Sequence, residues 1–311
     1  MKDFLILNKL KKFYLPLSFV IVVFILLVLF SLDIYIKNTI EKDRIFPSSL
    51  LISTEVKFPV FKTEFIPLIS AQGAVIMDAD SKTVLFSKNP QLRFSPASTT
   101  KIMTALTALD YFKPSDILTV KTASSDGVVL GLKQGEKMTF ENLLYALLLP
   151  SANDAALAIS ENYPGGEEAF VNKMNDNAKK INLFNTHYQD PAGLLDDGDY
   201  TTPVDLARLT SVVIKNPEFA KVVSTKSKTI SDITGYDIYN LSNLNELLGI
   251  NGVDGVKTGY TEEAGQVLVT SKLENGHTII LIVMLSDDRF LDTERLLNLV
   301  TNNISYLSIH P

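Results

Sequence analysis

The chain has 311 residues, 46% hydrophobic and 21% charged, so it holds enough apolar material for a sizeable core and is not a disordered chain. It contains no cysteine and only three histidines, which excludes disulfides, thiol catalysis and cysteine-based metal sites. We therefore expect no metal and no cofactor. The net charge is −6, and because residues 1–44 carry +3, the remainder carries −9. Such an acidic body argues against a nucleic-acid partner, which needs clustered basic residues.

An uncharged apolar stretch runs from Phe13 to Leu32 near the N-terminus. At 1.5 Å per residue, a helix of this length crosses about 30 Å of hydrocarbon. Lysines at positions 9, 11 and 12 precede it directly, and by the positive-inside rule they hold the N-terminus in the cytoplasm. A cleaved signal peptide is the alternative, but its apolar core is shorter and ends in small residues that this stretch lacks. We expect a single-pass membrane protein whose body lies outside the cytoplasm.

The remaining chain divides into a short linker and one large domain. Residues 37–70 contain three prolines among short mixed segments, in which no helical or strand period persists. We predict the following division: a cytoplasmic tail at 1–12, a transmembrane anchor at 13–36, a tether at 37–70 and a globular domain at 71–311.

Strand signals lie at both ends of this domain, and helical signals lie between them. The first predicted hairpin pairs residues 74–78 with 83–87, and the second pairs 266–272 with 277–285 around Asn275-Gly276, a strong hairpin signal. Apolar residues at helical spacing predict helices over 96–111, 140–148, 154–163, 167–181, 203–215 and 292–306. This order predicts an α+β domain, in which helices cover an antiparallel sheet.

The first segment with chemical potential contains Ser98 and Lys101. Ser95 followed by Pro96 predicts a helix start with the serine as N-cap, so Ser98 falls in the first turn and Lys101 one turn later. Residues three apart share a helix face, which brings the hydroxyl and the amine together. A serine needs a neighbouring base to become a nucleophile, and a lysine is such a base only when its pKa is lowered. The alternative interpretation of these residues is an ordinary capped helix with a solvated lysine.

Two further segments are ambiguous when each is taken alone. Ser151 and Asn153 follow Pro150, and helix capping is an ordinary explanation for both of them. Lys257-Thr258-Gly259 lies in a β-branched run, where a lysine on an edge strand deters aggregation. The alternative is a strand that lines a cleft, in which the lysine and threonine face an anionic group and the glycine allows close backbone approach.

Taken together and in this order, Ser-x-x-Lys, Ser-x-Asn and Lys-Thr-Gly are the signature of active-site serine penicillin-recognising enzymes. Residues 71–306 resemble, more narrowly, the D-alanyl-D-alanine carboxypeptidases, the low-molecular-mass penicillin-binding proteins. Further similar stretches are 74–79, 150–156, 190–194 and 254–259. The resemblance implies a β-lactamase/transpeptidase-like domain with a helical subdomain, a peptidoglycan stem peptide ending in D-Ala-D-Ala as substrate, and β-lactam antibiotics as covalent inhibitors. Unlike many relatives, this chain has its expected anchor at the N-terminus.

The resemblance also implies roles for single residues in the reaction. Ser98 would attack the carbonyl of the penultimate D-alanine, Lys101 would take its proton as general base, and Ser151 would relay a proton toward the leaving D-alanine. Asn153 would hydrogen-bond the substrate's peptide amide.

Other residues would bind the substrate without taking part in proton transfer. Backbone N–H groups of Ser98 and Tyr260 would form the oxyanion hole. Thr258 would bind the terminal carboxylate next to Lys257 and Gly259. Arg289 is assigned to the same carboxylate from a weaker local similarity.

The residues leave some alternatives open. A class A β-lactamase shares the motifs, but it needs a glutamate on a loop that here reads His187-Tyr188-Gln189-Asp190-Pro191-Ala192-Gly193-Leu194. A catalytically silent, membrane-tethered peptidoglycan-binding protein should have lost one of the motif residues, and all are present. A transpeptidase differs only in its acyl acceptor and is not separated by these residues. A Ser–His–Asp triad through His187 is not expected, because nothing sets this histidine near Ser98.

Overall fold

The computed structural model describes residues 21–22, 27–32, 56–63, 65–195 and 198–309. The predicted cytoplasmic tail and most of the predicted anchor lie outside these residues. Within the described parts of the chain, no helix is both long enough and apolar enough to cross a membrane. Residues 57–309 form one compact unit, separate from a unit made of residues 1–56 and 310–311. The fold and the site described below belong to residues 57–309, apart from the first residue of strand β1.

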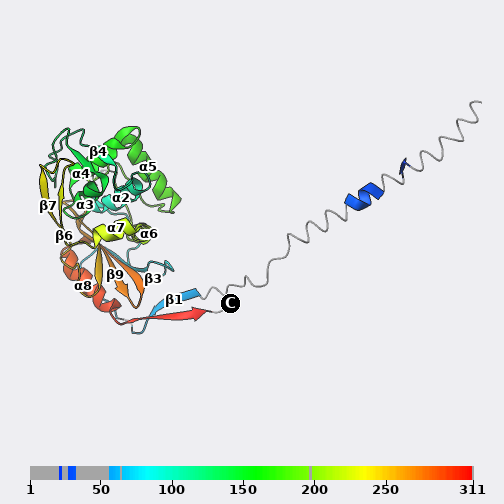
Figure 1. Ribbon diagram of the computed structural model, residues 1–311. Coiled ribbons are helices and arrows are strands. Elements are labelled where there is room, and N and C mark those ends of the chain that lie inside the picture. Colours follow the sequence, from blue (N-terminus) through cyan, green and yellow to red (C-terminus); the bar gives the residue numbers. More distant parts are fainter. Residues whose placement is uncertain (1–20, 23–26, 33–55, 64, 196–197, 310–311) are drawn as a thin grey trace, which may run out of the picture. The chain divides into compact units, whose positions relative to one another are not determined.

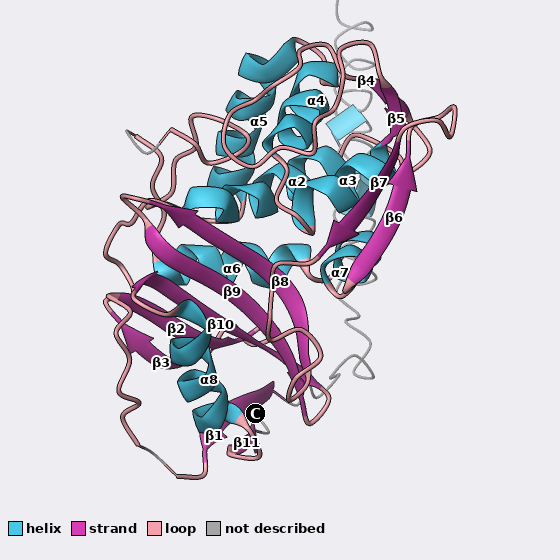
Figure 2. Ribbon diagram, turned by 90° about the vertical axis from the view of Figure 1, so that its left-hand side faces the viewer, coloured by secondary structure: helices cyan, strands magenta, loops and turns pink. Residues whose placement is uncertain are grey.

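A five-stranded antiparallel sheet lies at the centre of this unit, in the order β3-β2-β10-β9-β8 (Figure 2). Its strands are β2 (Gly73–Asp78), β3 (Val84–Lys88), β8 (Val253–Thr261), β9 (Gly265–Glu274) and β10 (His277–Ser286). Both predicted hairpins are therefore confirmed. The turn of the second hairpin has positive φ angles at Asn275 (51°) and Gly276 (81°), as the Asn-Gly signal requires.

Helices and two small sheets fill the chain between β3 and β8 (Figure 1). The helical elements are the 3₁₀ turn η2 (Ala97–Thr100), α2 (Lys101–Leu109), α3 (Phe140–Leu148), α4 (Asn153–Asn162), α5 (Gly166–Lys180), α6 (Pro203–Val213) and α7 (Pro217–Val223). The small sheets pair β4 (Ile117–Thr119) with β5 (Lys137–Thr139), and β6 (Ser227–Ser231) with β7 (Ile238–Ser242). Helix α8 (Arg289–Val300) follows the central sheet.

The central sheet is covered on both faces, which explains why the inner strands β2 and β10 are mostly apolar. In β2, Val75 and Met77 join the core that the sheet shares with the helices α2–α7. Ala74 and Ile76 point the other way and join a second core, to which α8 contributes Leu296 among others. Figure 2 shows α8 against one face of the sheet and the remaining helices beyond it. The predicted α+β class is confirmed.

Two predictions near the ends of the domain are wrong. Residues 56–61, predicted as part of an irregular tether, form strand β1 (Val56–Phe61), and the predicted helix over 292–306 ends at Val300. Strand β11 (Ile304–Ile309) follows and pairs with β1 (Figure 1). The helix stops because Thr301 turns to an extended conformation (ψ 119°) and Asn302 adopts a left-handed φ of 56°. The Asn303 carbonyl then accepts a hydrogen bond from the Lys62 backbone at 2.8 Å.

Candidate active site

Ser98 lies in the 3₁₀ turn η2, directly before helix α2. The expected N-cap role of Ser95 is wrong, since the turn begins at Ala97 and its cap position falls on Pro96 without a side-chain hydrogen bond. The reason is the backbone of Ala97, whose φ of 46° breaks the helical path after Pro96. The chain therefore bends sharply just before Ser98. The predicted pairing of Ser98 with Lys101 across one turn is confirmed by the geometry below.

The Lys101 ammonium group has three neighbours at hydrogen-bond distance. Its Nζ lies 3.1 Å from Ser98 Oγ, 2.7 Å from Asn153 Oδ1 and 2.7 Å from the Ala192 carbonyl. The amide and carbonyl oxygens only accept, so they take two N–H bonds of the amine. When the amine is neutral, its lone pair is the group left to face the Ser98 hydroxyl. This arrangement is the one that a general base needs.

Burial allows the Lys101 amine to lose its proton near neutral pH. Lys101 is completely inaccessible to solvent. Desolvation lowers its pKa to about 7, although the negative charge of Asp190 acts in the opposite direction. The solvated lysine of an ordinary capped helix is therefore excluded.

The second motif approaches Lys101 from the start of helix α4. Neither Ser151 nor Asn153 caps this helix, because the cap position falls on Ala152 and has no side-chain hydrogen bond. Ser151 adopts a φ of 68°, and its buried Oγ has no hydrogen-bond partner within the described chain. Asn153 bridges the Lys101 amine and the Asp126 carbonyl, to which its Nδ2 donates at 2.8 Å. A strained backbone and an unsatisfied buried hydroxyl are features of functional sites rather than of caps.

The carboxylate of Asp154 holds the loop over residues 128–132 against this motif. Asp154, completely buried, accepts backbone N–H bonds from Leu130 at 3.0 Å, Gly131 at 2.8 Å and Leu132 at 3.0 Å. The Asn153 N–H also donates to the Val128 carbonyl at 2.7 Å. The loop before β5 is thereby fixed to the start of α4, which sets the position of the Asn153 side chain.

The third motif lies on β8, an edge strand of the central sheet. Lys257 is only 2% exposed, so it does not act as a solvated lysine that protects an edge. A Cβ atom added to Gly259 would lie 3.2 Å from Ala97 Cβ and 3.3 Å from the Ser98 nitrogen. Glycine thus allows β8 to pack closely against η2. This contact brings Thr258 and Tyr260, on either side of Gly259, next to the turn that carries Ser98.

Three basic side chains collect around this strand. Within the residues that the structure describes, no ion pair is formed by Lys101, Lys257 or Arg289. Burial, reinforced by Lys101 and Arg289, lowers the pKa of Lys257 well below its usual value. Arg289 donates from Nη1 to the Gly259 carbonyl at 2.9 Å, and its buried Nε has no partner in the described chain. Such a cluster favours an anionic ligand.

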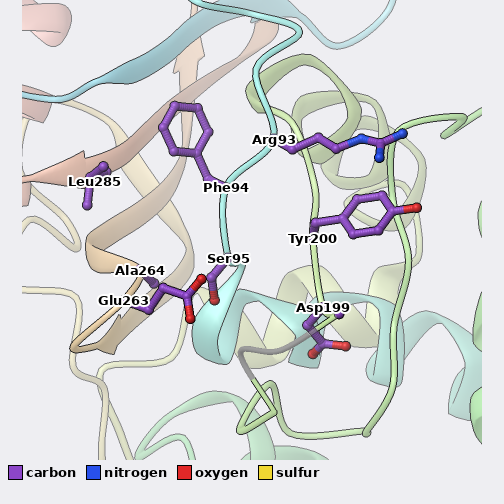
Figure 3. Close-up of a pocket in the computed structure, with 9 residues that line it drawn as sticks. Arg93, Phe94, Ser95, Asp199, Tyr200, Glu263, Ala264 and Leu285 are labelled. Atoms are coloured by element: carbon purple, nitrogen blue, oxygen red, sulfur yellow. The ribbon is translucent and has the colours of Figure 1, made fainter.

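One cavity borders the site, and another lies beside the segment that precedes Ser98. A cavity of about 360 Å³ opens beside Asn153 and Ala192, and Leu157, Glu167 and Leu194 also line it. A second cavity of about 410 Å³ contains no motif side chain. Figure 3 shows Ser95 and Glu263 facing each other in this second cavity, with Arg93 beside the ring of Tyr200.

His187 takes no part in the site, as expected from the sequence. Its backbone pairs with that of Tyr200, and its ring lies 6.0 Å from the Tyr200 ring. The base that contacts Ser98 Oγ is Lys101.

One acceptor at the site was not predicted from the sequence, namely the Ala192 carbonyl that fixes Lys101. A backbone oxygen is present at every residue, so its use leaves no mark in the residue types. The only signal was indirect, because Ala192 lies in one of the stretches that resemble the family.

A serine hydroxyl facing a buried lysine, a buried Ser-x-Asn turn and a Lys-Thr-Gly edge strand form the motif set of the active-site serine penicillin-recognising class. Within this class, the chain belongs to peptidase family S11, D-alanyl-D-alanine carboxypeptidase, whose model matches residues 61–288. The resemblance inferred from the motifs is thus confirmed.

Similar proteins support this assignment at the level of sequence and of fold. A D-alanyl-D-alanine carboxypeptidase of Bacillus subtilis is 38% identical over 220 residues, which are 68% of this chain and 57% of that protein. A D-alanyl-D-alanine carboxypeptidase of Streptomyces sp. K15 is 35% identical over 71% of this chain and 82% of its own length. The crystal structure of the Streptomyces K15 DD-transpeptidase matches with a TM-score of 0.72 at 34% identity, over 76% of this chain and 98% of that one. This chain therefore spans little more than half the length of the Bacillus relative.

Proposed function

We propose that this protein removes the terminal D-alanine from peptidoglycan stem peptides through an acyl-enzyme on Ser98. The observation that carries the proposal is the Lys101 amine, which is buried, has a pKa of about 7 and faces Ser98 Oγ at 3.1 Å. A base with a pKa near the working pH is the most effective kind for general base catalysis.

In the acylation step, the Ser98 oxygen adds to the carbonyl carbon of the penultimate D-alanine while its proton passes to the Lys101 amine. The backbone N–H groups of Ser98 and Tyr260 stabilise the oxyanion. As the tetrahedral intermediate collapses, the C–N bond breaks and the departing D-alanine nitrogen gains a proton through the Ser151 hydroxyl. The Ser151 hydroxyl has no hydrogen-bond partner among the described residues, so it is available to carry this proton.

The terminal carboxylate of the substrate provides the anion that the cation cluster lacks. We assign it to Thr258, with Arg289 supplying positive charge and the basic side chain of Lys257 nearby. A hydrogen bond to a charged group contributes about 1.5–3 kcal/mol, enough to select a free C-terminus. Asn153, already held by two hydrogen bonds, presents its amide toward the peptide bond of the substrate.

In the deacylation step, water adds to the ester carbonyl and Ser98 regains its proton, so that a shortened peptide leaves. The loop that carries a glutamate in class A β-lactamases offers no free carboxylate for this step. Its acid, Asp190, accepts four backbone N–H bonds. Slow deacylation of a bound β-lactam follows, and β-lactams would inhibit this enzyme covalently.

Transfer to an amine is the second candidate function. The protein of the solved Streptomyces structure is named a DD-transpeptidase. The same acyl-enzyme serves hydrolysis and transfer, which differ in whether water or an amine attacks the ester. Adding glycine or a D-amino acid during turnover separates the two, because a transpeptidase forms the new peptide in proportion to the amine.

We also propose that the catalytic domain lies outside the cytoplasm, held by the N-terminal apolar stretch. The lysines at positions 9, 11 and 12 and the location of peptidoglycan support this placement. Protease added to intact cells should then remove the domain, and full protection would reverse the orientation.

The activity is tested by measuring D-alanine release from an N-acylated tripeptide ending in D-Ala-D-Ala, using the full chain in detergent. We expect steady release by the wild-type protein and none by Ser98→Ala. Release by Ser98→Ala at the wild-type rate would contradict the proposal.

A further inference from the structure

The loop over residues 190–195 is organised by one side chain to which the reaction above gives no part. The Oδ1 atom of Asp190 accepts the backbone N–H groups of Ala192 at 2.6 Å and Gly193 at 2.7 Å. Its Oδ2 atom accepts those of Leu194 at 3.0 Å and Leu195 at 2.9 Å. The carboxylate is only 8% exposed, so these bonds are made largely out of water and the loop is folded around it.

This loop contacts both elements that carry the reacting groups. Gly193 has a φ of 74°, and a Cβ atom there would lie 2.0 Å from the Ala97 carbonyl in the turn of Ser98. On the other side, Thr104 of helix α2 donates from Oγ1 to the Pro191 carbonyl at 2.6 Å. The loop is thus held against η2 and α2 at once.

The consequence for catalysis lies in the Ala192 carbonyl, which accepts from Lys101 Nζ at 2.7 Å. This bond occupies one N–H of the amine, and Asn153 occupies another. The direction of the remaining lone pair toward Ser98 therefore depends on where the loop holds the Ala192 carbonyl.

We propose that Asp190 is a positioning residue for the general base: it folds the 190–195 loop so that the Ala192 carbonyl orients the Lys101 amine toward Ser98. The inference rests on the proposed function, since it assigns Lys101 the role of base. It adds a residue that acts through the loop and through its charge and touches neither substrate nor Ser98.

Removing the charge of Asp190 should shift the pH dependence of the acylation rate. A loss of loop stability alone would not cause this shift. Asp190 attracts the protonated amine and raises the pKa of Lys101, against the larger lowering by burial. The other titratable group coupled to Lys101 is Lys257, whose own pKa Lys101 lowers. Neutralising Asp190 should therefore lower the pKa of Lys101 further and move the rise of the acylation rate to lower pH.

The test compares Asp190→Asn with wild type in the full chain, measuring β-lactam acylation rates across pH. An asparagine keeps at most one pair of the four bonds, because its NH₂ group faces two N–H donors. We expect the plateau rate to fall by about 10–100-fold, the scale of a catalytic group displaced by about 1 Å, and the rising limb to move to lower pH. The matched control is Asp78→Asn, a carboxylate 1% exposed that accepts from Ser81 and Tyr306 at the end of β2. Asp78→Asn should lower the melting temperature without shifting the rise of the acylation rate with pH.

A second variant keeps the proposal testable if Asp190→Asn does not fold. Thr104→Val removes the short hydroxyl bond to the Pro191 carbonyl, together with longer contacts to the Thr100 carbonyl and the Met174 sulfur, with no change of charge. It should lower the plateau rate several-fold and leave the limb unchanged. Wild-type rates in both variants, or an Asp190→Asn limb that stays in place, would overturn the inference. Absence of labelling in wild type would instead count against the proposed function.

Discussion

Gly259 lies so close to Ser98 that a Cβ atom on the glycine would stand 3.3 Å from the serine backbone nitrogen. This is the contact through which the edge strand β8 meets the turn η2. It sets the spacing between the backbone N–H groups of Ser98 and Tyr260, which we propose as the oxyanion hole. The spacing of such a hole tolerates little change.

The first prediction follows from this contact. Gly259→Ala would force β8 and η2 apart by a few tenths of an ångström, since Ala97 Cβ also lies 3.2 Å from the new atom. We expect kcat/KM to fall by about 10–100-fold, because small displacements of catalytic groups have effects on that scale. The melting temperature should change little. Unchanged kinetics would show that the spacing of β8 and η2 is not critical.

The second prediction concerns pH. The pKa of Lys101 is lowered to about 7, and the neutral amine is the reactive form, so the acylation rate should rise with pH and level off above that value. At pH 6 about one amine in ten is neutral, which predicts a rate about tenfold below the plateau.

The control for this profile is Lys101→Arg, because a guanidinium stays protonated across the range. We expect this variant to lose at least about 100-fold in acylation rate, the scale of general base catalysis. A wild-type profile that is flat between pH 5.5 and 8 would be inconsistent with Lys101 as the base.

The third prediction tests recognition of the terminal carboxylate. Thr258→Val removes a hydroxyl bond to a charged group, worth about 1.5–3 kcal/mol, and should lower kcat/KM for a D-Ala-D-Ala peptide by about 10–150-fold. The loss should be much smaller for the C-terminally amidated peptide. Equal losses on both substrates would mean that Thr258 supports the fold or the oxyanion hole.

Thr270→Val is the matched control for that substitution. Thr270 lies on the neighbouring strand β9, is fully buried, and has a hydroxyl without a partner in the described chain. Removing this hydroxyl should leave kcat/KM unchanged on both substrates, because it makes no hydrogen bond within the described chain.

The fourth prediction concerns the start of the folded domain. Asp292 of α8 accepts from the Ser70 backbone at 3.0 Å, the Ser70 hydroxyl at 2.6 Å and the Ala71 backbone at 2.8 Å. A protein starting at residue 72 loses these bonds and strand β1. We expect it to melt at least about 5 °C below one starting at residue 56, since a bond to a charged group contributes about 1.5–3 kcal/mol and 1 kcal/mol corresponds to about 2–4 °C. Equal melting temperatures would show that this segment adds no stability.

The site was predictable where its chemistry depends on side chains. Ser98, Lys101, Asn153 and Lys257 carry groups that are unusual in combination and stand in a recognisable order. In the structure, Lys101 contacts both Ser98 and Asn153. Lys257 is buried, and the charge of Lys101 contributes to the lowering of its pKa. The hairpin at Asn275-Gly276 was predictable for the same reason, because few residues adopt its backbone angles.

The rest depends on backbone geometry and on contacts between distant segments. The positive φ of Ala97, which moves the helix start past Ser95, has no signature in an alanine. Strands β1 and β11 pair across most of the chain, with Thr63 and Asn303 in contact at a separation of 240 residues, and local periodicity carries no information on such a pairing. The Ala192 carbonyl was hidden because it is a backbone group.

The central claim is that Ser98, activated by Lys101, forms the acyl-enzyme. The most direct test is to incubate the full chain with a penicillin, digest it and locate the adduct by mass spectrometry. We predict one adduct, on the peptide that contains Ser98, absent from Ser98→Ala and slow to form in Lys101→Arg. An adduct on another residue, or one that persists in Ser98→Ala, would contradict the claim.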